Sequence, residues 1–107
     1  MNNQEYMQLA QRTSNTKTSK EKILNGVLGL CGESGEVIDH VKKHLFQGHE
    51  LDKEYIKDEC SDVLWYIVEI LEGVGYTLDE TMTHNIRKLQ KRYPKGFEAN
   101  KSINREV

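Results

Sequence analysis

Apolar residues recur at a spacing of three and four through most of this chain, and this period is the feature that most constrains its fold. Alternating apolar and polar residues, which would indicate strands, are absent, and the one proline is Pro94. The pattern predicts a short helix over about 3–12 and longer helices over about 18–46, 52–72 and 77–93. The predicted fold is therefore all-α, an antiparallel helical bundle of about four helices.

Capping signals mark the expected starts of the three longer helices. Thr18 is followed three residues later by Glu21, and Thr77 is followed in the same way by Glu80. This is the capping-box pattern, in which a hydroxyl and a carboxylate satisfy free backbone N–H groups at a helix start. Asp52 is the predicted N-cap of the helix between them.

The composition indicates a small domain with a modest core. Hydrophobic residues make up 36% of the 107 residues and charged residues 30%, with a mean hydropathy of −0.72. We expect a single domain over 1–107, with its core over 20–97 and a flexible C-terminal tail over 98–107. Because so polar a chain buries little apolar surface alone, we expect oligomerisation to complete the bundle.

Charge and hydropathy argue against several classes of protein. A net charge of −2 does not suit a binder of nucleic acid polymers. No run of 18 apolar residues predicts a membrane span, and the first residues lack the apolar core of a secretory signal. We therefore expect a cytoplasmic protein without a membrane partner. The two cysteines, Cys31 and Cys60, are expected to be reduced residues of the core.

The segment GVLGLCGESGEV, residues 26–37, places four glycines in a predicted helix, where each costs about 1 kcal/mol relative to alanine. At 100° per residue, Gly26 and Gly29 share an arc with Glu33 and Glu36. The apolar residues lie on another arc, which is expected to face the core: Ile23, Val27, Leu30, Cys31, Ile38, Val41 and Leu45. We expect the glycines to let a neighbouring helix or a substrate approach the carboxylates.

The third predicted helix carries a similar acidic pair, Glu59 and Asp62. Such pairs usually lie on a solvated face, and in a chain with 17 acidic residues their number is no evidence for a site. Their surroundings matter more, because Glu33 lies among small residues and Asp62 among apolar ones, where an unpaired carboxylate is costly. A divalent cation, Mg²⁺ or Mn²⁺, would be a natural partner for four converging carboxylates.

The fourth predicted helix carries Asn85, Lys88 and Arg92 along one edge. Alone, this is an ordinary amphipathic helix whose dipole favours basic residues in the last turn. Beside a metal–carboxylate site, Lys88 and Arg92 become candidate ligands for phosphate oxygens. Trp65 is a candidate to stack on a nucleobase, and packing or an oligomer contact explains it about equally well. Glu69 is expected to be a surface acid.

These residues resemble the motifs of the MazG-like nucleotide pyrophosphohydrolases. The sequence ESGE at 33–36, followed after 22 residues by ECSD at 59–62, is similar to that family's two acidic motifs. The stretch NIRKLQKRYPKGF at 85–97 is similar to its C-terminal motif, and the resemblance covers about 22–97. Ser34 and Gly35 stand where many members have further acidic or bulky residues, which leaves the number of metal ions open.

The resemblance implies a role for each matching residue. It assigns the role of catalytic Mg²⁺ ligand to four acids: Glu33, Glu36, Glu59 and Asp62. Asn85 and Lys88 would contact the nucleotide, with Arg92 a weaker candidate. The implied reaction is cleavage of a (d)NTP between its α and β phosphates to (d)NMP and pyrophosphate, by a homodimer or homotetramer. Whether the role is housecleaning of non-standard nucleotides stays open.

An alternative keeps the same fold without the chemistry. The chain would then be a non-catalytic helical oligomer that acts as a regulatory or interaction module. The preferred base and sugar, the carboxylate that activates water, and the choice between dimer and tetramer stay open at this point.

Overall fold

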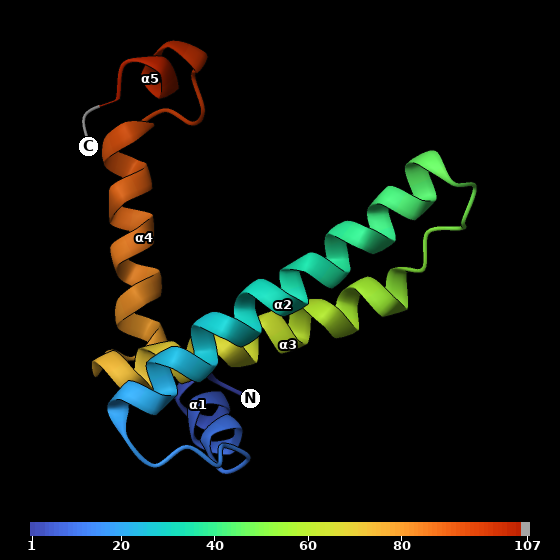
Figure 1. Cartoon of the computed structure of the whole chain (residues 1–107). Coiled ribbons are helices and arrows are strands. Elements are labelled where there is room, and N and C mark those ends of the chain that lie inside the picture. The colour runs from blue at the N-terminus through green and yellow to red at the C-terminus, as the bar shows by residue number, and fades with distance from the viewer. Residues whose placement is uncertain (106–107) are drawn as a thin grey trace.

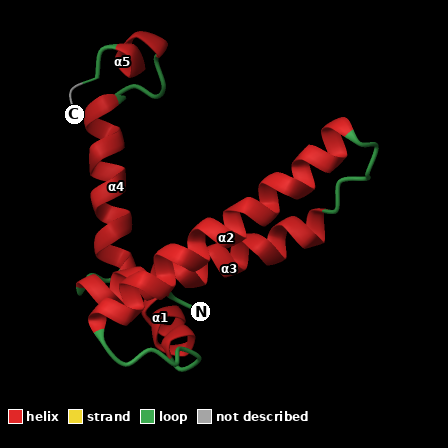
Figure 2. Cartoon of the chain, in the orientation of Figure 1, coloured by secondary structure: helices red, strands yellow, loops and turns green. Residues whose placement is uncertain are grey.

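The computed structural model describes residues 1–105, and every regular element in that range is a helix, which confirms the all-α prediction (Figure 2). The helices are α1 (Asn3–Gln11), α2 (Ser19–Phe46), α3 (Lys53–Val74), α4 (Leu78–Arg92) and α5 (Ala99–Ile103). Helices α2 and α3 pack side by side as a long antiparallel hairpin (Figure 1). Helix α4 stands away from the hairpin, and its main packing is against α1.

The predicted capping residues begin their helices as expected. The Thr18 side chain accepts a hydrogen bond from the Glu21 backbone N–H at 3.1 Å, and Thr77 does the same for Glu80 at 3.1 Å. Asp52 accepts from the backbone N–H of the third residue of α3 at 3.1 Å. Each cap satisfies a backbone donor that has no partner inside the helix.

The predicted tail contains regular structure that its sequence did not indicate. Residues 99–103 form the short helix α5, which follows a turn at Pro94 and Gly96. Residues 106–107 of the predicted tail lie outside the described part of the chain. None of the helices in the described range is long and apolar enough to span a membrane.

The α2–α3 pair is close because two glycines of α2 face α3. A Cβ added at Gly26 would lie 2.9 Å from the Tyr66 carbonyl oxygen, and one added at Gly29 would collide with the Tyr66 ring. Gly32 and Gly35 have no such neighbour within 4 Å. The expectation that Gly26 and Gly29 let a neighbouring helix approach the carboxylates is therefore confirmed, and that helix is α3.

The apolar arc of α2 faces the core only in part, so the prediction is wrong for some of its residues. Val27, Ile38 and Leu45 are exposed, with Ile38 at 67%, and both cysteines are exposed as well. Ile23, Leu30 and Val41 of the same arc are half-buried, and Ile23 lies against Gly73 of α3. The glycine and glutamate arc occupies the closest contact with α3, so the other residues of the apolar arc point outward. Within the described residues the buried hydrophobic side chains are only Met7, Ala10 and Val68.

Candidate functional site

Three carboxylates converge where α2 crosses the middle of α3. One oxygen each from Glu33 of α2 and from Glu59 and Asp62 of α3 lie within 4.8 Å of one another. Glu59 is only 7% exposed, and one buried oxygen of Glu33 and one of Glu59 have no hydrogen-bond partner among the described residues. Buried polar atoms normally have partners, so these two oxygens indicate a missing donor or cation.

The electrostatics of Glu59 show how crowded the cluster is. Hydrogen bonding to Glu33 and then to Glu36, followed by burial and repulsion from both carboxylates, raises the pKa of Glu59 to about 8. Glu36 is exposed and lies beside Glu59, although its oxygens are outside the tight group of three. The site therefore favours a positive charge or a proton between its carboxylates.

The donor set suits a hard divalent cation. All of the ligand atoms are carboxylate oxygens, from Glu33, Glu59 and Asp62, with Glu36 adjacent. Such oxygens are the ligands that Mg²⁺ and Mn²⁺ prefer, whereas zinc usually takes nitrogen or sulfur. The four predicted acids are thus brought to one place, three of them closely and the fourth at the edge.

Aromatic side chains border the carboxylates. Glu33, Asp62, Trp65 and Tyr66 line one hollow of about 310 Å³. The Trp65 and Tyr66 rings meet edge to face, with their centroids 5.2 Å apart. Burial and then the charge of Asp62 raise the pKa of the Tyr6 phenol, which shows that α1 also reaches this place. An aromatic surface beside a metal–carboxylate cluster can bind the flat face of a base.

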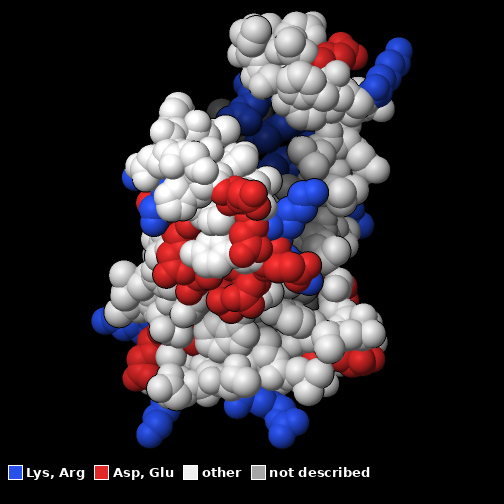
Figure 3. All heavy atoms as spheres, turned by 90° about the vertical axis from the view of Figure 1, so that its right-hand side faces the viewer, with Lys and Arg blue, Asp and Glu red and all other residues white. Residues whose placement is uncertain are grey.

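The predicted phosphate ligands are on a different part of the molecule. Lys88 and Arg92 line a hollow of about 510 Å³ between α4 and α5, together with Lys91 and Lys101. Asn85 is exposed on the same helix. Figure 3 shows acidic side chains gathered on the visible face, with basic side chains beside them and in a hollow above them. Within one chain, the structure does not bring this basic group to the carboxylates.

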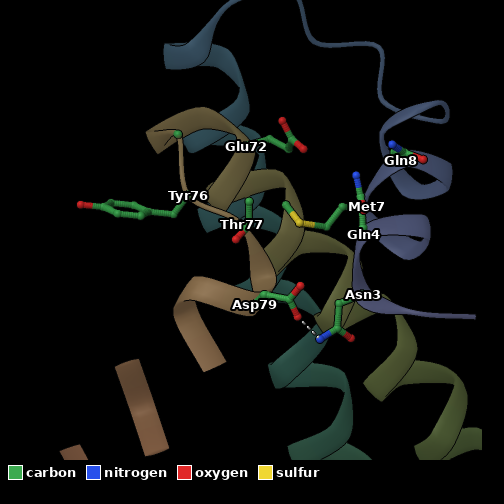
Figure 4. A pocket seen from close by; sticks show the side chains of 9 residues that line it. Asn3, Gln4, Met7, Gln8, Glu72, Tyr76, Thr77 and Asp79 are labelled. Carbon is green, nitrogen blue, oxygen red and sulfur yellow. Dashed lines mark hydrogen bonds between the residues drawn. The ribbon is translucent and has the colours of Figure 1, made fainter. Parts of the chain in front are cut away.

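Another hollow, of about 510 Å³, lies at the junction of α1, α3 and α4, and it contains none of the predicted site residues (Figure 4). Asn3 donates a hydrogen bond to Asp79 there at 2.7 Å, and Met7 contacts the backbone N–H of Leu78. Glu72 points into the same hollow from α3. These contacts attach the beginning of α4 to α1, so this junction sets the direction in which α4 leaves the hairpin.

The chain presents paired acidic motifs from two adjacent helices of an all-α hairpin, and this arrangement is the feature to compare with known families. Residues 21–97 match the MazG nucleotide pyrophosphohydrolase domain, and the chain belongs to that family. It is also 29% identical over 82 residues to the Gene 37 protein of Mycobacterium phage L5, a match that covers 73% of this chain and 72% of the phage protein. No solved structure matches the chain significantly.

Proposed function

We propose that the chain is an Mg²⁺-dependent nucleoside triphosphate pyrophosphohydrolase that cleaves (d)NTPs between the α and β phosphates. The observation that carries this proposal is the convergence of Glu33, Glu59 and Asp62, with two buried oxygens that have no protein partner. Membership of the nucleotide pyrophosphohydrolase family supports the same reaction. The products would be a (d)NMP and pyrophosphate.

Each group of the site has a role in this reaction. The carboxylates of Glu33, Glu36, Glu59 and Asp62 would hold the cation, which would neutralise phosphate charge and lower the pKa of the attacking water. Because the free protein keeps a proton on Glu59 up to a pH of about 8, metal binding must displace that proton. Trp65 and Tyr66 would stack against the base, next to the carboxylates that receive the phosphates.

The basic group of α4 is proposed to act on a second copy of the chain. Lys88 and Arg92 are suited to the negative charge of a leaving pyrophosphate, yet α4 stands away from its own hairpin. The outward apolar arc of α2 offers a surface for such a copy, and so do Met82 and Ile86 of α4, which are 49% and 53% exposed. Exposed apolar patches of this kind mark interaction sites. We therefore propose a homodimer or homotetramer.

The direct experiment measures pyrophosphate release from a panel of standard and modified (d)NTPs in the presence of Mg²⁺. Glu36→Gln and Asp62→Asn should each weaken metal binding and turnover. Asp58→Asn is the matched control, because Asp58 is an exposed residue of the same helix, next to Glu59. Absence of turnover for every nucleotide, with metal binding unchanged in the two acid variants, would favour the non-catalytic module instead.

A further inference from the structure

The most completely buried acid of the described chain is Glu69 on α3, which is 0% exposed and has no part in the proposed reaction. The prediction that it is a surface acid is therefore wrong. Its carboxylate accepts hydrogen bonds from four side chains: Gln11 Nε2 at 3.0 Å, Ser14 Oγ at 2.9 Å, Asn25 Nδ2 at 2.9 Å and Thr16 Oγ1 at 3.2 Å. The ammonium group of Lys22 lies 3.7 Å away.

This environment keeps Glu69 ionised at neutral pH. Burial alone would raise the pKa of its carboxyl, but the hydrogen bonds from Gln11, Asn25 and Ser14 and the charge of Lys22 outweigh burial and lower it. Lys22 also donates to Gln11 at 2.8 Å, so the donors are linked to one another. A fully satisfied network of this kind specifies one geometry for the segments that it joins.

Most of the donors belong to a segment that we term the N-terminal cap, residues 3–18, which comprises α1 and the loop after it. This cap precedes the residues that match the family domain. It is also bound by Trp65, whose indole N–H donates to Ala10 O at 3.2 Å and to Thr13 Oγ1 at 2.9 Å. Met7 and Ala10 add apolar contacts to the same face of α3.

The cap is held along the face of α3 that leads to the carboxylates. Asp62, Trp65 and Glu69 are spaced at i, i+3 and i+7, so they follow one another along a single face of the helix. Trp65 lines the hollow that also contains Asp62, and Tyr6 of the cap packs against the same small core cluster as Trp65. Displacement of the cap would therefore change the aromatic surroundings of the carboxylates.

We propose that Glu69 is a positioning residue of the nucleotide site. Its carboxylate fixes the N-terminal cap on α3 and thereby holds Trp65 and Tyr6 beside Asp62, as one wall of the space for the base. The proposal rests on the proposed function, because it assigns the wall to a bound nucleotide. It adds a segment outside the family domain to that site, and it gives a role to a buried charge ten positions beyond Glu59.

A pair of donor variants separates positioning from simple stabilisation. Ser14 and Asn25 each donate to Glu69 at 2.9 Å, but Ser14 belongs to the cap and Asn25 to α2. Ser14→Ala and Asn25→Ala should therefore cost similar stability, whereas only Ser14→Ala loosens the cap. Glu69→Gln should loosen it further, and Asp58→Asn, at an exposed position on the same helix away from the cap, is the neutral control.

The NMR signal of Trp65 and the binding of nucleotide analogues both report on the wall that Trp65 and Tyr6 form. Trp65 is the only tryptophan of the chain, so its indole N–H gives a single assignable NMR signal. We expect this signal to shift in Ser14→Ala and Glu69→Gln. The same variants should weaken binding of the α,β-imido analogues of the four dNTPs about fivefold or more, while Asn25→Ala and Asp58→Asn stay within about twofold of the native dissociation constants.

The outcomes distinguish this inference from the proposed reaction. Equal losses of analogue binding in Ser14→Ala and Asn25→Ala, or no change in folded Glu69→Gln, would overturn the positioning role. Failure of the native chain to bind any of the analogues would overturn it as well. Analogue binding that depends on Ser14 and Glu69, without any release of pyrophosphate from dNTPs, would uphold the inference and reject the proposed function.

Discussion

Glu59 and Glu69 lie on the same helix, and both are buried, yet the protein treats their charges in opposite ways. Hydrogen bonding to Glu33 and Glu36, then burial, raises the pKa of Glu59 to about 8, whereas donors from three segments lower the pKa of Glu69. Glu59 faces acceptors and Glu69 faces donors. Burial alone therefore does not identify a functional acid, because the neighbours decide whether the charge is satisfied.

The difference assigns the two positions to different tasks. The carboxylate of Glu69 finds its hydrogen-bond partners within the chain, and such a satisfied buried network fixes local geometry. The carboxylates around Glu59 lack such donors, and their close approach becomes favourable only when a proton or a cation lies between them. Unsatisfied buried groups of this kind are typical of sites that bind something, and the protein accepts a local cost in stability for them.

The largest effects are expected when Glu59 and Glu69 are neutralised one at a time, which tests whether the two acids differ in their effects on activity and stability. Glu59→Gln should reduce Mg²⁺-dependent pyrophosphate release by about 100-fold or more, since it would remove one of the proposed metal ligands. It should not lower the stability of the metal-free protein at neutral pH, because the amide replaces a carboxyl group whose raised pKa shows that its ionised form is disfavoured there. Glu69→Gln should instead lower the free energy of unfolding by about 2 kcal/mol, as the loss of hydrogen bonds to a charged group does.

Urea unfolding without metal and a turnover assay with Mg²⁺ measure both effects. Asp58→Asn, on the exposed side of the same helix, controls for loss of one charge. If Glu59→Gln and Glu69→Gln destabilised the metal-free protein equally, the contrast between an unsatisfied and a satisfied carboxylate would be wrong.

Separating the two helices should affect the carboxylate cluster next most strongly. Gly29→Leu would drive a side chain into the Tyr66 ring and push α2 away from α3, so Glu33 would move away from Glu59. We expect a loss of about 3 kcal/mol in stability, at the upper end for overpacking, together with weaker Mg²⁺ binding. Gly32→Ala meets nothing within 4 Å and should instead stabilise α2 by about 1 kcal/mol.

Thermal unfolding and Mg²⁺ titration of both variants provide the measurement. The paired substitution is informative because both glycines lie in the same glycine-rich stretch of α2 and differ in what they face. Unchanged Mg²⁺ binding in Gly29→Leu would show that the α2–α3 distance does not set the cluster.

The pH dependence of stability gives a smaller effect with opposite signs for the two acids. Between the ordinary value of 4.5 and about 8, folded Glu59 keeps a proton that the unfolded chain has released. The stability of the metal-free protein should therefore fall as the pH rises through this range. Glu69 has a lowered pKa, so its contribution is present above the ordinary value and is lost as the pH falls through its folded pKa.

Chemical denaturation from pH 4 to 9 tests both slopes. Glu59→Gln should remove the decline toward alkaline pH, and Glu69→Gln should reduce the loss in acid. Mg²⁺ competes with the proton on Glu59, so its apparent affinity should rise with pH up to about 8. An affinity that is flat over this range would show that Glu59 does not exchange a proton for the metal.

Features that depend on near neighbours in the chain can be predicted from the sequence. Helix positions, the caps at Thr18, Asp52 and Thr77, and the acidic pairs on their helix faces all follow from spacings of three and four residues. The same local spacing indicated that Gly26 and Gly29 lie beside the acids. Residue chemistry then predicted that carboxylates in such surroundings need a cation, and the structure brings three of them together.

Which face of a helix forms an interface is visible only in the folded structure. Periodicity shows that α2 has an apolar arc and a glycine–glutamate arc, but it does not show which one contacts α3. The glycines face α3 because they allow the closer approach of the two helices, and Val27 and Ile38 are therefore exposed to solvent. The sequence also does not predict the contact between the N-terminal cap and Glu69. Gln11, Ser14 and Asn25 reach Glu69 only after the chain has folded back on itself.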